Sequence, residues 1–281
     1  MKNLTFKNKT VLITGASSGI GKEFAHQLAS QSANLIITSR TNSVLVELAK
    51  ILQSENPSIW VKTIGVDLSE SDGARLLFSK VDDMGLSVDF LINNAGFGKF
   101  CEFSGETFLS YHKMMMLNMN ALVELTHLFL PYMKEKNSGG VINVGSTGSF
   151  QPLPYQAVYG ACKAFVLNFS EALSGELLNT NIRVMALCPG VTESNFMKRA
   201  NADTSEMKFS STEKVVNTAL SAYGKNRVYV VSGCVNYLTS LIPRFVSRKR
   251  AVKIVANMFK NSVLNNKVLR KREIRGRTLL Q

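Results

Sequence analysis

The chain has 281 residues, of which 45% are hydrophobic and 19% are charged. This length and composition are typical of one large globular domain with a sizeable core, and they exclude an intrinsically disordered chain. The formal net charge is +13, but residues 241–281 hold twelve Lys and Arg side chains and one acid, Glu273. The basic character therefore belongs to the C-terminal segment, and the residues before it are nearly neutral.

The sequence shows no sign of a targeting or membrane-spanning segment. The first residues contain no apolar run of signal-peptide length, and nowhere do about 18 uninterrupted apolar residues occur. The three histidines have no metal-ligand spacing, and no CxxC pair exists among Cys101, Cys162, Cys188 and Cys234. We therefore expect a cytoplasmic protein with reduced thiols and no metal site.

Short apolar segments alternate with amphipathic segments along the chain. The predicted strands are Thr10–Thr14, Leu35–Thr38, Ile59–Ile64, Phe90–Ile92, Val141–Val144, Val184–Leu187 and Val228–Val231. The predicted helices lie near 20–31, 42–55, 71–84, 107–136, 156–178 and 211–223. Most strands are continuous apolar runs, as expected when helices cover both faces of a sheet. The pattern predicts an α/β fold, a Rossmann-like doubly wound parallel sheet that binds ligands beyond the carboxyl ends of its strands.

A glycine-rich turn, TGASSGIG, follows the first predicted strand and opens the first helix. Its candidate cofactor-binding residues are Gly15, Ser17, Ser18, Gly19, Ile20 and Gly21. Glycines let the backbone approach a pyrophosphate closely, and a helix N-terminus presents free N–H groups to it. The turn is a candidate phosphate site, although a tight strand–helix turn without a ligand remains the alternative.

The end of the second predicted strand bears on cofactor preference. An NAD site needs an acid there to hold the ribose hydroxyls, and the sequence has Arg40 instead. Arg40 would bind a 2′-phosphate through charge-assisted hydrogen bonds, which predicts NADP(H) as the preferred cofactor and NAD(H) as a lesser one. The alternative is a solvated arginine at the start of a helix.

Two further strand ends supply candidate cofactor contacts. Asp67 follows the third strand, where a carboxylate accepts a bond from the adenine amino group or caps the next helix. Asn94, Ala95 and Gly96 follow the fourth strand, where they line the cofactor and tie neighbouring strand ends, or form a simple turn.

A tyrosine and a lysine lie four residues apart on a predicted helix. Tyr159 and Lys163 therefore share one face. A nearby ammonium favours the phenolate and lowers the phenol pKa from about 10, so that Tyr159 exchanges a proton with a carbonyl or an alcohol. Ser146, at the end of the fifth strand, would donate a hydrogen bond to the same oxygen. Taken alone, such a Tyr–Lys pair is more often structural.

Together these motifs resemble the short-chain dehydrogenase/reductase family. TGASSGIG, the NNAG of 93–96, Ser146 and the YGACK of 159–163 fall in the family's order over roughly residues 8–235, and Ser146 lies thirteen residues before Tyr159, as in the family. The resemblance implies hydride transfer between a nicotinamide and a carbonyl or hydroxyl carbon. It implies Tyr159 as general acid/base, Lys163 as the residue that lowers its pKa and binds the ribose, and Ser146 as the group that polarises the substrate oxygen.

The same resemblance implies the remaining catalytic residue. The family places an asparagine thirteen residues before a Leu-Pro proline, here Pro131, which identifies Asn118 rather than Asn120. Such an asparagine would hold a water that links Lys163 to bulk solvent.

Further cofactor contacts are implied after the sixth strand. Pro189 and Gly190 fall as in the family, so that the backbone of Val191 would contact the nicotinamide carboxamide and Thr192 would add a side-chain contact. NADP-preferring relatives often carry a basic residue where this chain has Ser18, which leaves most of the phosphate recognition to Arg40.

The substrate side is less defined by sequence. The resemblance places a lid over 191–210, and the candidate lining of an apolar pocket is Phe97, Phe150, Tyr155, Phe196 and Met197. We expect an apolar ketone, a ketoacyl compound or the corresponding alcohol as substrate, and a homo-oligomer as in relatives. The alternative is an NADP(H)-binding sensor or membrane-surface scaffold without turnover.

We divide the chain into a catalytic domain, 1–235, and a basic amphipathic extension, 236–281. After Pro243 one predicted helical face holds Phe245, Val252, Val255 and Phe259, and the other holds Lys249, Arg250, Lys253 and Lys260. This pattern indicates either peripheral contact with an anionic membrane or a helix docked on the body. Nucleic-acid binding is disfavoured, because the basic cluster at 270–272 lacks interleaved aromatic residues.

Overall fold

The sheet of the computed structural model has seven strands, and all of its pairings are parallel. The structure describes residues 6–200, 202 and 208–260. The strands are β1 (Thr10–Thr14), β2 (Asn34–Ser39), β3 (Val61–Gly65), β4 (Phe90–Asn93), β5 (Gly139–Val144), β6 (Ile182–Cys188) and β7 (Tyr229–Val231). Their order in space is β3-β2-β1-β4-β5-β6-β7, so the chain crosses over between β3 and β4. The predicted doubly wound sheet is confirmed.

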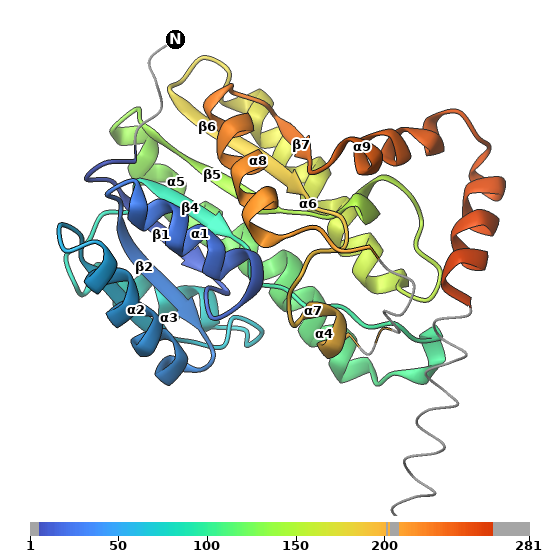
Figure 1. The fold of residues 1–281 in the computed structure, drawn as a ribbon, viewed down its shortest axis with the longest axis horizontal. Helices are drawn as coiled ribbons and strands as arrows, with labels where there is room; N and C mark the ends of the chain where they lie inside the picture. The colour runs from blue at the N-terminus through green and yellow to red at the C-terminus, as the bar shows by residue number, and fades with distance from the viewer. Residues whose placement is uncertain (1–5, 201, 203–207, 261–281) are drawn as a thin grey trace, which may run out of the picture.

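Helices cover both faces of this sheet (Figure 1). Those on one face are α1 (Gly19–Ser30), α2 (Asn42–Glu55) and α8 (Thr212–Gly224), and the main ones on the other are α3 (Gly73–Asp82), α5 (Ala121–Glu135) and α6 (Ala157–Glu176). Successive strand residues supply the two cores alternately: Val11 and Ile13 pack with the first group of helices, and Leu12 with the second. This two-sided burial explains why the strands are continuous apolar runs.

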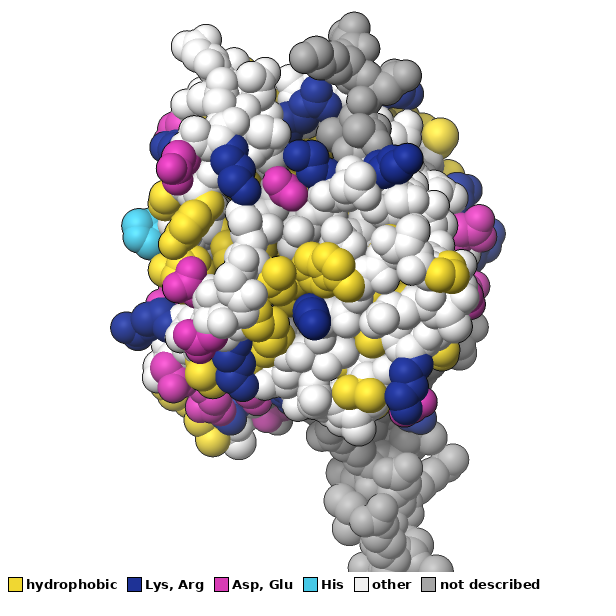
Figure 2. Space-filling model, turned by 90° about the vertical axis from the view of Figure 1, so that its left-hand side faces the viewer, with side chains coloured by type: hydrophobic (Ala, Val, Ile, Leu, Met, Phe, Trp, Pro, Cys, Tyr) yellow, Lys and Arg dark blue, Asp and Glu magenta, His cyan; other side chains and the backbone are white. Residues whose placement is uncertain are grey.

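The side of the molecule that carries α2 displays both acidic and basic side chains (Figure 2). Such a mixed surface matches the near-neutral charge of the sequence before residue 241.

The predicted helix 107–136 is interrupted in the structure. It consists of α4 (Phe108–Met115), a π-helical turn (Met116–Asn120) and α5. Thr107 caps the start of α4 by accepting a hydrogen bond from the backbone N–H of Ser110 at 3.2 Å. The π-helical turn changes the direction of the side chains within the segment, and such turns are frequent at functional sites.

The chain beyond β7 folds back against the body. It forms α9 (Cys234–Leu241), a 3₁₀ turn (Ile242–Arg244) and a helix over 248–260. Ala251 and Val255 are buried, whereas Phe245 is 84% exposed and Val252 is 39% exposed. The predicted apolar face is therefore wrong at Phe245 and Val252, because the helix begins after Phe245 and turns Val252 toward solvent.

The predicted extension contains a helix, α9, that was not predicted from the sequence. It begins just before the proposed boundary at 235/236. The basic cluster at 270–272 lies outside the described residues, as does part of the proposed lid. None of the helices in the described ranges has the length and apolarity needed to cross a bilayer.

Candidate active site

The glycine-rich turn lies at the carboxyl end of β1, beside β4. Gly15 and Gly19 have φ values of +66° and +57°, which side chains rarely tolerate. A Cβ on Gly15 would lie 2.9 Å from the Cα of Ala95, so the two strand ends approach closely. Ser18 precedes α1 without a side-chain capping bond. The turn therefore presents an uncapped helix N-terminus to the cavity, which suits a pyrophosphate.

Asn94 and Thr14 tie the ends of β1 and β4 together. The side-chain amide of Asn94 donates to the carbonyl oxygens of Thr14 and Gly15 at 2.9 and 3.2 Å. The Thr14 hydroxyl in turn accepts from the backbone N–H groups of Asn94 and Ala95, both at 3.0 Å. These bonds fix the two strand ends at the point where the strand order reverses, which is where doubly wound sheets bind ligands.

Arg40 and Asp67 lie at the outer end of the same cavity. Arg40 is exposed. The carboxylate of Asp67 accepts from the N–H and hydroxyl of Ser69 at 2.9 and 2.7 Å. Burial opposes ionisation of Asp67, but the Ser69 bonds and the charges of Arg40 and Lys113 outweigh it and hold its pKa below the ordinary value. Asp72 rather than Asp67 is the N-cap residue of α3, so the predicted capping role of Asp67 is wrong. The Asp67 carboxylate holds a local turn and lines the cavity, where the predicted adenine contact would lie.

The candidate catalytic side chains come from two neighbouring segments. Ser146 precedes a 3₁₀ turn (Thr147–Phe150) after β5, and its hydroxyl accepts from the N–H of Gly148 at 3.0 Å. Tyr159 and Lys163 lie one turn apart on α6, with the Lys163 Nζ 5.7 Å from the Tyr159 ring centre. The Lys163 Nζ donates to the carbonyl oxygen of Val144 at 2.7 Å. The three predicted side chains therefore converge at the end of β5.

The hydroxyl of Ser149 links the Ser146 turn to α6, and this role was not predicted from the sequence. The hydroxyl donates to the carbonyl oxygen of Lys163 at 2.7 Å and accepts from the N–H of Ser146 at 3.2 Å. It therefore fixes the start of the Ser146 turn against α6. A serine in a loop carries no sequence signal for such a role, because both partners are set by tertiary contact.

Burial dominates the proton equilibria of the site. It raises the pKa of Tyr159 to about 12, against the opposing hydrogen bond from Ser146. Burial also lowers the pKa of Lys163 to about 8. The pKa of Tyr159 therefore lies above its ordinary value, opposite to the lowering expected from Lys163, because desolvation is the largest effect.

Asn118 lies in the π-helical turn and is 1% exposed, whereas Asn120 is exposed. The side-chain amide of Asn118 pairs with both backbone groups of Phe97. It accepts from the N–H at 3.2 Å and donates to the carbonyl oxygen at 2.8 Å. Gly96 lies between Asn118 and Lys163: a Cβ there would be 2.5 Å from the Asn118 Oδ1 and 3.5 Å from the Lys163 Nζ. The absence of a side chain at Gly96 therefore lets these two groups approach each other.

One cavity of about 1360 Å³ joins the glycine-rich turn, Ser146, Tyr159 and Lys163, whereas Asn118 does not line it. The predicted cofactor residues that line it are Gly15, Ser17, Ser18, Gly19, Ile20, Arg40, Asp67, Asn94, Ala95, Gly96, Tyr159, Lys163, Pro189, Gly190, Val191 and Thr192. Gly21 does not line it. A Cβ on Gly21 would lie 2.5 Å from the carbonyl oxygen of Gly15, so this glycine serves the packing of α1 on β1.

The substrate end of the cavity is apolar, but its lining differs in part from the prediction. Phe97, Phe196 and Met197 line it as expected. Phe150 packs instead against the core at β6 and β7, and Tyr155 borders a separate small cavity. The side chains that the sequence analysis missed are Phe100, Leu109, Leu153, Met258 and Phe259. The last two come from the helix 248–260, whose approach to the site has no local sequence signal.

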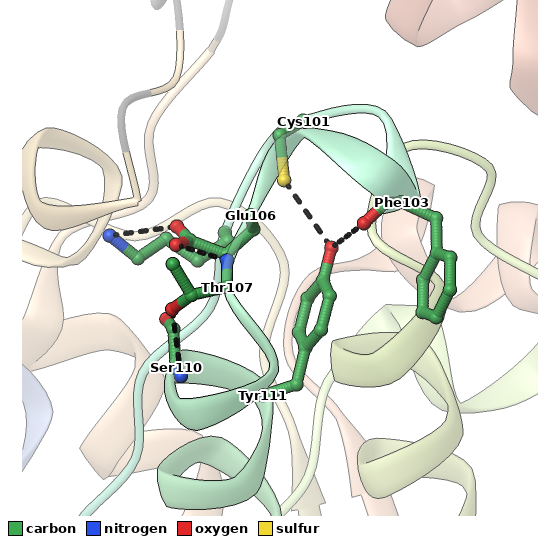
Figure 3. Close-up of polar contacts among 7 residues, drawn as sticks. Cys101, Phe103, Glu106, Thr107, Ser110 and Tyr111 are labelled. Atoms are coloured by element: carbon green, nitrogen blue, oxygen red, sulfur yellow. Dashed lines mark hydrogen bonds and ion pairs between the residues drawn. The ribbon is translucent and has the colours of Figure 1, made fainter.

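The loop that carries Phe97 and Phe100 is held by polar contacts around Tyr111 (Figure 3). The Tyr111 hydroxyl donates to the carbonyl oxygen of Phe103 at 2.9 Å and lies 3.7 Å from the Cys101 sulfur. Burial and the contact with Cys101 raise the pKa of Tyr111. The phenol therefore stays protonated and holds this wall of the cavity in place.

Comparison with known proteins agrees with this geometry. A family model described as short chain dehydrogenase matches residues 9–205. The chain belongs to the short-chain dehydrogenases.

Individual relatives support the same assignment. A sulfoacetaldehyde reductase of Chromohalobacter salexigens is 37% identical over 188 residues, which are 66% of this chain and 73% of that protein. A ketoacyl reductase of Nostoc sp. is 28% identical over 243 residues, which are 86% of this chain and 84% of that protein. A solved short-chain dehydrogenase from Sphingobium yanoikuyae, in complex with NADPH, has a TM-score of 0.77 at 28% identity, over 84% of this chain and 93% of that chain.

Membership of the short-chain dehydrogenases gives the class of reaction. The protein is an NAD(P)-dependent oxidoreductase that acts on a carbonyl or hydroxyl group. Its sheet, its glycine-rich turn and its cavity at the crossover of the sheet are those of a nicotinamide-binding fold.

Proposed function

We propose that this short-chain dehydrogenase is an NADP(H)-dependent reductase of apolar ketones, or acts in reverse on the corresponding alcohols. The observation that carries the proposal is the continuous cavity. Its outer end has a phosphate-binding turn and the exposed side chain of Arg40, and its inner end is lined by aromatic and aliphatic side chains. Tyr159 lies where the two ends meet, within the apolar cluster that also holds Phe97 and Phe196.

In this proposal Tyr159 is the group that exchanges a proton with the substrate oxygen. When bound, the nicotinamide supplies the hydride for reduction or accepts it in oxidation. Because burial keeps the phenol protonated at neutral pH, Tyr159 is ready to donate to a carbonyl oxygen. The Ser146 hydroxyl, which hydrogen-bonds the phenol, is placed to donate to the same oxygen and stabilise its developing charge.

Lys163 and Asn118 support that proton transfer. The buried ammonium of Lys163 would compensate negative charge on Tyr159 and bind the nicotinamide ribose through its remaining N–H groups. Asn118 would hold a water next to Lys163, since Gly96, which has no side chain, lies close to both groups. We assign the carboxamide contact to the backbone of Val191, with Thr192 beside it.

Cofactor preference is tested at Arg40. We expect Arg40→Asp to weaken NADPH binding relative to NADH by roughly 10–100-fold, because a charged hydrogen bond to the 2′-phosphate is lost and a repulsive carboxylate replaces it. Fluorescence titration with each nucleotide measures this ratio. Lys62→Asp is the matched charge reversal, since Lys62 is an exposed residue of β3 that does not line the cavity. An unchanged NADPH-to-NADH ratio in Arg40→Asp would remove the phosphate argument.

The proposed substrate class is tested with a ketone panel. We expect turnover of ketones that carry an aliphatic chain or a fused ring, followed by loss of NADPH absorbance, and poor turnover of small hydrophilic aldehydes. Tight NADPH binding without turnover of any apolar ketone or ketoacyl compound would favour the sensor alternative instead.

Two proposals concern the surface. We propose a homo-oligomer through α5 and α6, which expose Tyr132 and Phe165 at 42% and 41%. A solution mass equal to that of a single 31.0 kDa chain would contradict the oligomer.

We also propose that the protein is cytoplasmic and contacts membranes peripherally through its basic C-terminal segment, whose charges suit an anionic surface.

A further inference from the structure

Residues 234–260, which we name the C-terminal arm, cross the substrate end of the cavity. The arm consists of α9, the 3₁₀ turn, residues 245–247 and the helix 248–260. Figure 1 shows it leaving β7 at the right of the molecule and descending along that side. The arm residues that line the cavity are Asn236, Thr239, Ser240, Met258 and Phe259. Both ends of the arm therefore touch the site.

The inner face of the arm packs on the substrate end. The ring of Phe259 lies 5.5 Å from that of Phe100 in an edge-to-face arrangement, and it shares an apolar cluster with Met197 and Ala200. Val255 is buried in the same cluster as Tyr159. The helix 248–260 is therefore a wall of the substrate pocket as well as a surface element.

The outer face of α9 and the turn after it expose large apolar side chains to solvent. The most exposed are Val235, Leu238, Ile242 and Phe245, at 77%, 63%, 47% and 84%. Val235 and Leu238 lie three residues apart on α9 and therefore share one face of it, and Ile242 begins the 3₁₀ turn that follows. Such a contiguous exposed group marks an interaction surface rather than scattered apolar residues.

The charge beside this apolar face has one sign. The basic residues of the arm are Arg244, Arg248, Lys249, Arg250, Lys253 and Lys260, and no Asp or Glu occurs anywhere between Glu213 and Glu273. Lys249, Arg250 and Lys253 are exposed, and helical geometry places them opposite the buried Ala251 and Val255. The arm thus combines an exposed apolar group, which we name the apolar wedge (Val235, Leu238, Ile242 and Phe245), with a basic helix face formed by Lys249, Arg250 and Lys253.

We infer that the C-terminal arm rests on an anionic lipid bilayer, and that the pocket beneath it takes an apolar ketone or alcohol directly from that bilayer. The apolar wedge suits the acyl boundary and the basic face suits lipid headgroups. A second copy of the chain is a poorer occupant, because it would bring an equally basic arm to the same place. A nucleic acid would leave the apolar wedge exposed. The inference rests on the proposed function for its substrate route, and its docking surface specifies the residues of the membrane contact proposed there.

Vesicle flotation tests the docking surface. We expect the full chain to float with vesicles of phosphatidylcholine and phosphatidylserine but not with phosphatidylcholine alone, and raised salt should weaken the binding. Lys249→Glu/Arg250→Glu/Lys253→Glu should reduce binding at least about tenfold, as should Leu238→Ser/Phe245→Ser. Lys62→Glu/Lys80→Glu/Lys225→Glu, an equal charge change elsewhere, should bind like the unmodified chain. Equal loss in both triple variants, or equal binding to neutral vesicles, would overturn the inference.

A second measurement separates the arm from the chemistry. The wild-type rate of NADPH oxidation with 2-dodecanone dissolved in vesicles should be several-fold higher in anionic than in neutral vesicles. Lys249→Glu/Arg250→Glu/Lys253→Glu should lose that difference yet keep its rate with water-soluble cyclohexanone. Turnover of both ketones without any vesicle effect would overturn the arm inference alone. Vesicle binding without turnover of either ketone would leave the docking surface standing and overturn the substrate route together with the proposed function.

Discussion

Replacing Tyr159 with phenylalanine is expected to lower kcat by roughly 10²–10⁴-fold, the usual contribution of a positioned general acid. The substitution removes only the hydroxyl from a side chain that is 9% exposed and packed among apolar neighbours, so the fold should persist. NADPH titration should give a nearly unchanged Kd, because the phosphate-binding turn and Arg40 lie at the other end of the cavity. The loss should therefore appear in kcat rather than in cofactor affinity.

The matched control is Tyr111→Phe. Tyr111 belongs to the same apolar cluster, but its hydroxyl bonds the backbone of Phe103 and does not line the main cavity. We expect that variant to lose stability and to keep most of its kcat. Full activity in Tyr159→Phe would show that another group exchanges the proton, and equal losses of activity in both variants would point to a structural cause.

Replacing Lys163 with methionine is also expected to abolish most turnover. The variant keeps a long unbranched side chain but loses the charge beside Tyr159 and the bond to the carbonyl oxygen of Val144. Both kcat and cofactor affinity should fall, since the proposed role of Lys163 includes the nicotinamide ribose. A variant with wild-type kcat would contradict that role. The pH dependence of the stability shows whether a loss of activity comes from misfolding rather than from loss of the catalytic role.

The stability of wild type relative to Lys163→Met should change with pH in a defined direction. Burial lowers the folded-state pKa of Lys163 to about 8, whereas an unfolded lysine titrates near 10.4. Between about pH 8 and 10 the unfolded state binds more protons, so wild type should gain stability relative to the variant as pH rises through that window. Urea denaturation of the cofactor-free proteins at pH 7 and pH 9.5 measures the change. A relative gain at the lower pH would contradict the burial of an uncompensated ammonium.

The sequence predicts the sheet and the main site because each depends on local patterns. Continuous apolar runs such as Leu35–Ile37 require burial on both faces, and six of the proposed cofactor residues lie within the single turn 15–21. Gly21 shows the limit of a motif, because it does not line the cavity and the close approach of the Gly15 backbone already requires a glycine there.

Features that depend on distant partners could not be predicted. The π-helical turn that directs Asn118 is coupled to the backbone of Phe97, which lies on another segment. The buried side chains of Asn93 and Asn143 bond each other across β4 and β5 at 2.9 Å, and nothing in their local sequence indicates it. The buried face of the helix 248–260 follows from contact with Phe100, so hydrophobic periodicity alone placed Val252 on the wrong side.

We expect hydride transfer between the nicotinamide and the carbonyl carbon of an apolar ketone, with Tyr159 as the proton donor. Mass spectrometry of the alcohol formed from 2-dodecanone, with NADPH carrying deuterium on both C4 positions of the nicotinamide ring, tests it most directly. The account predicts one deuterium on the carbinol carbon with wild type and almost no product with Tyr159→Phe. Product without deuterium, or equal labelling in the variant, would contradict it.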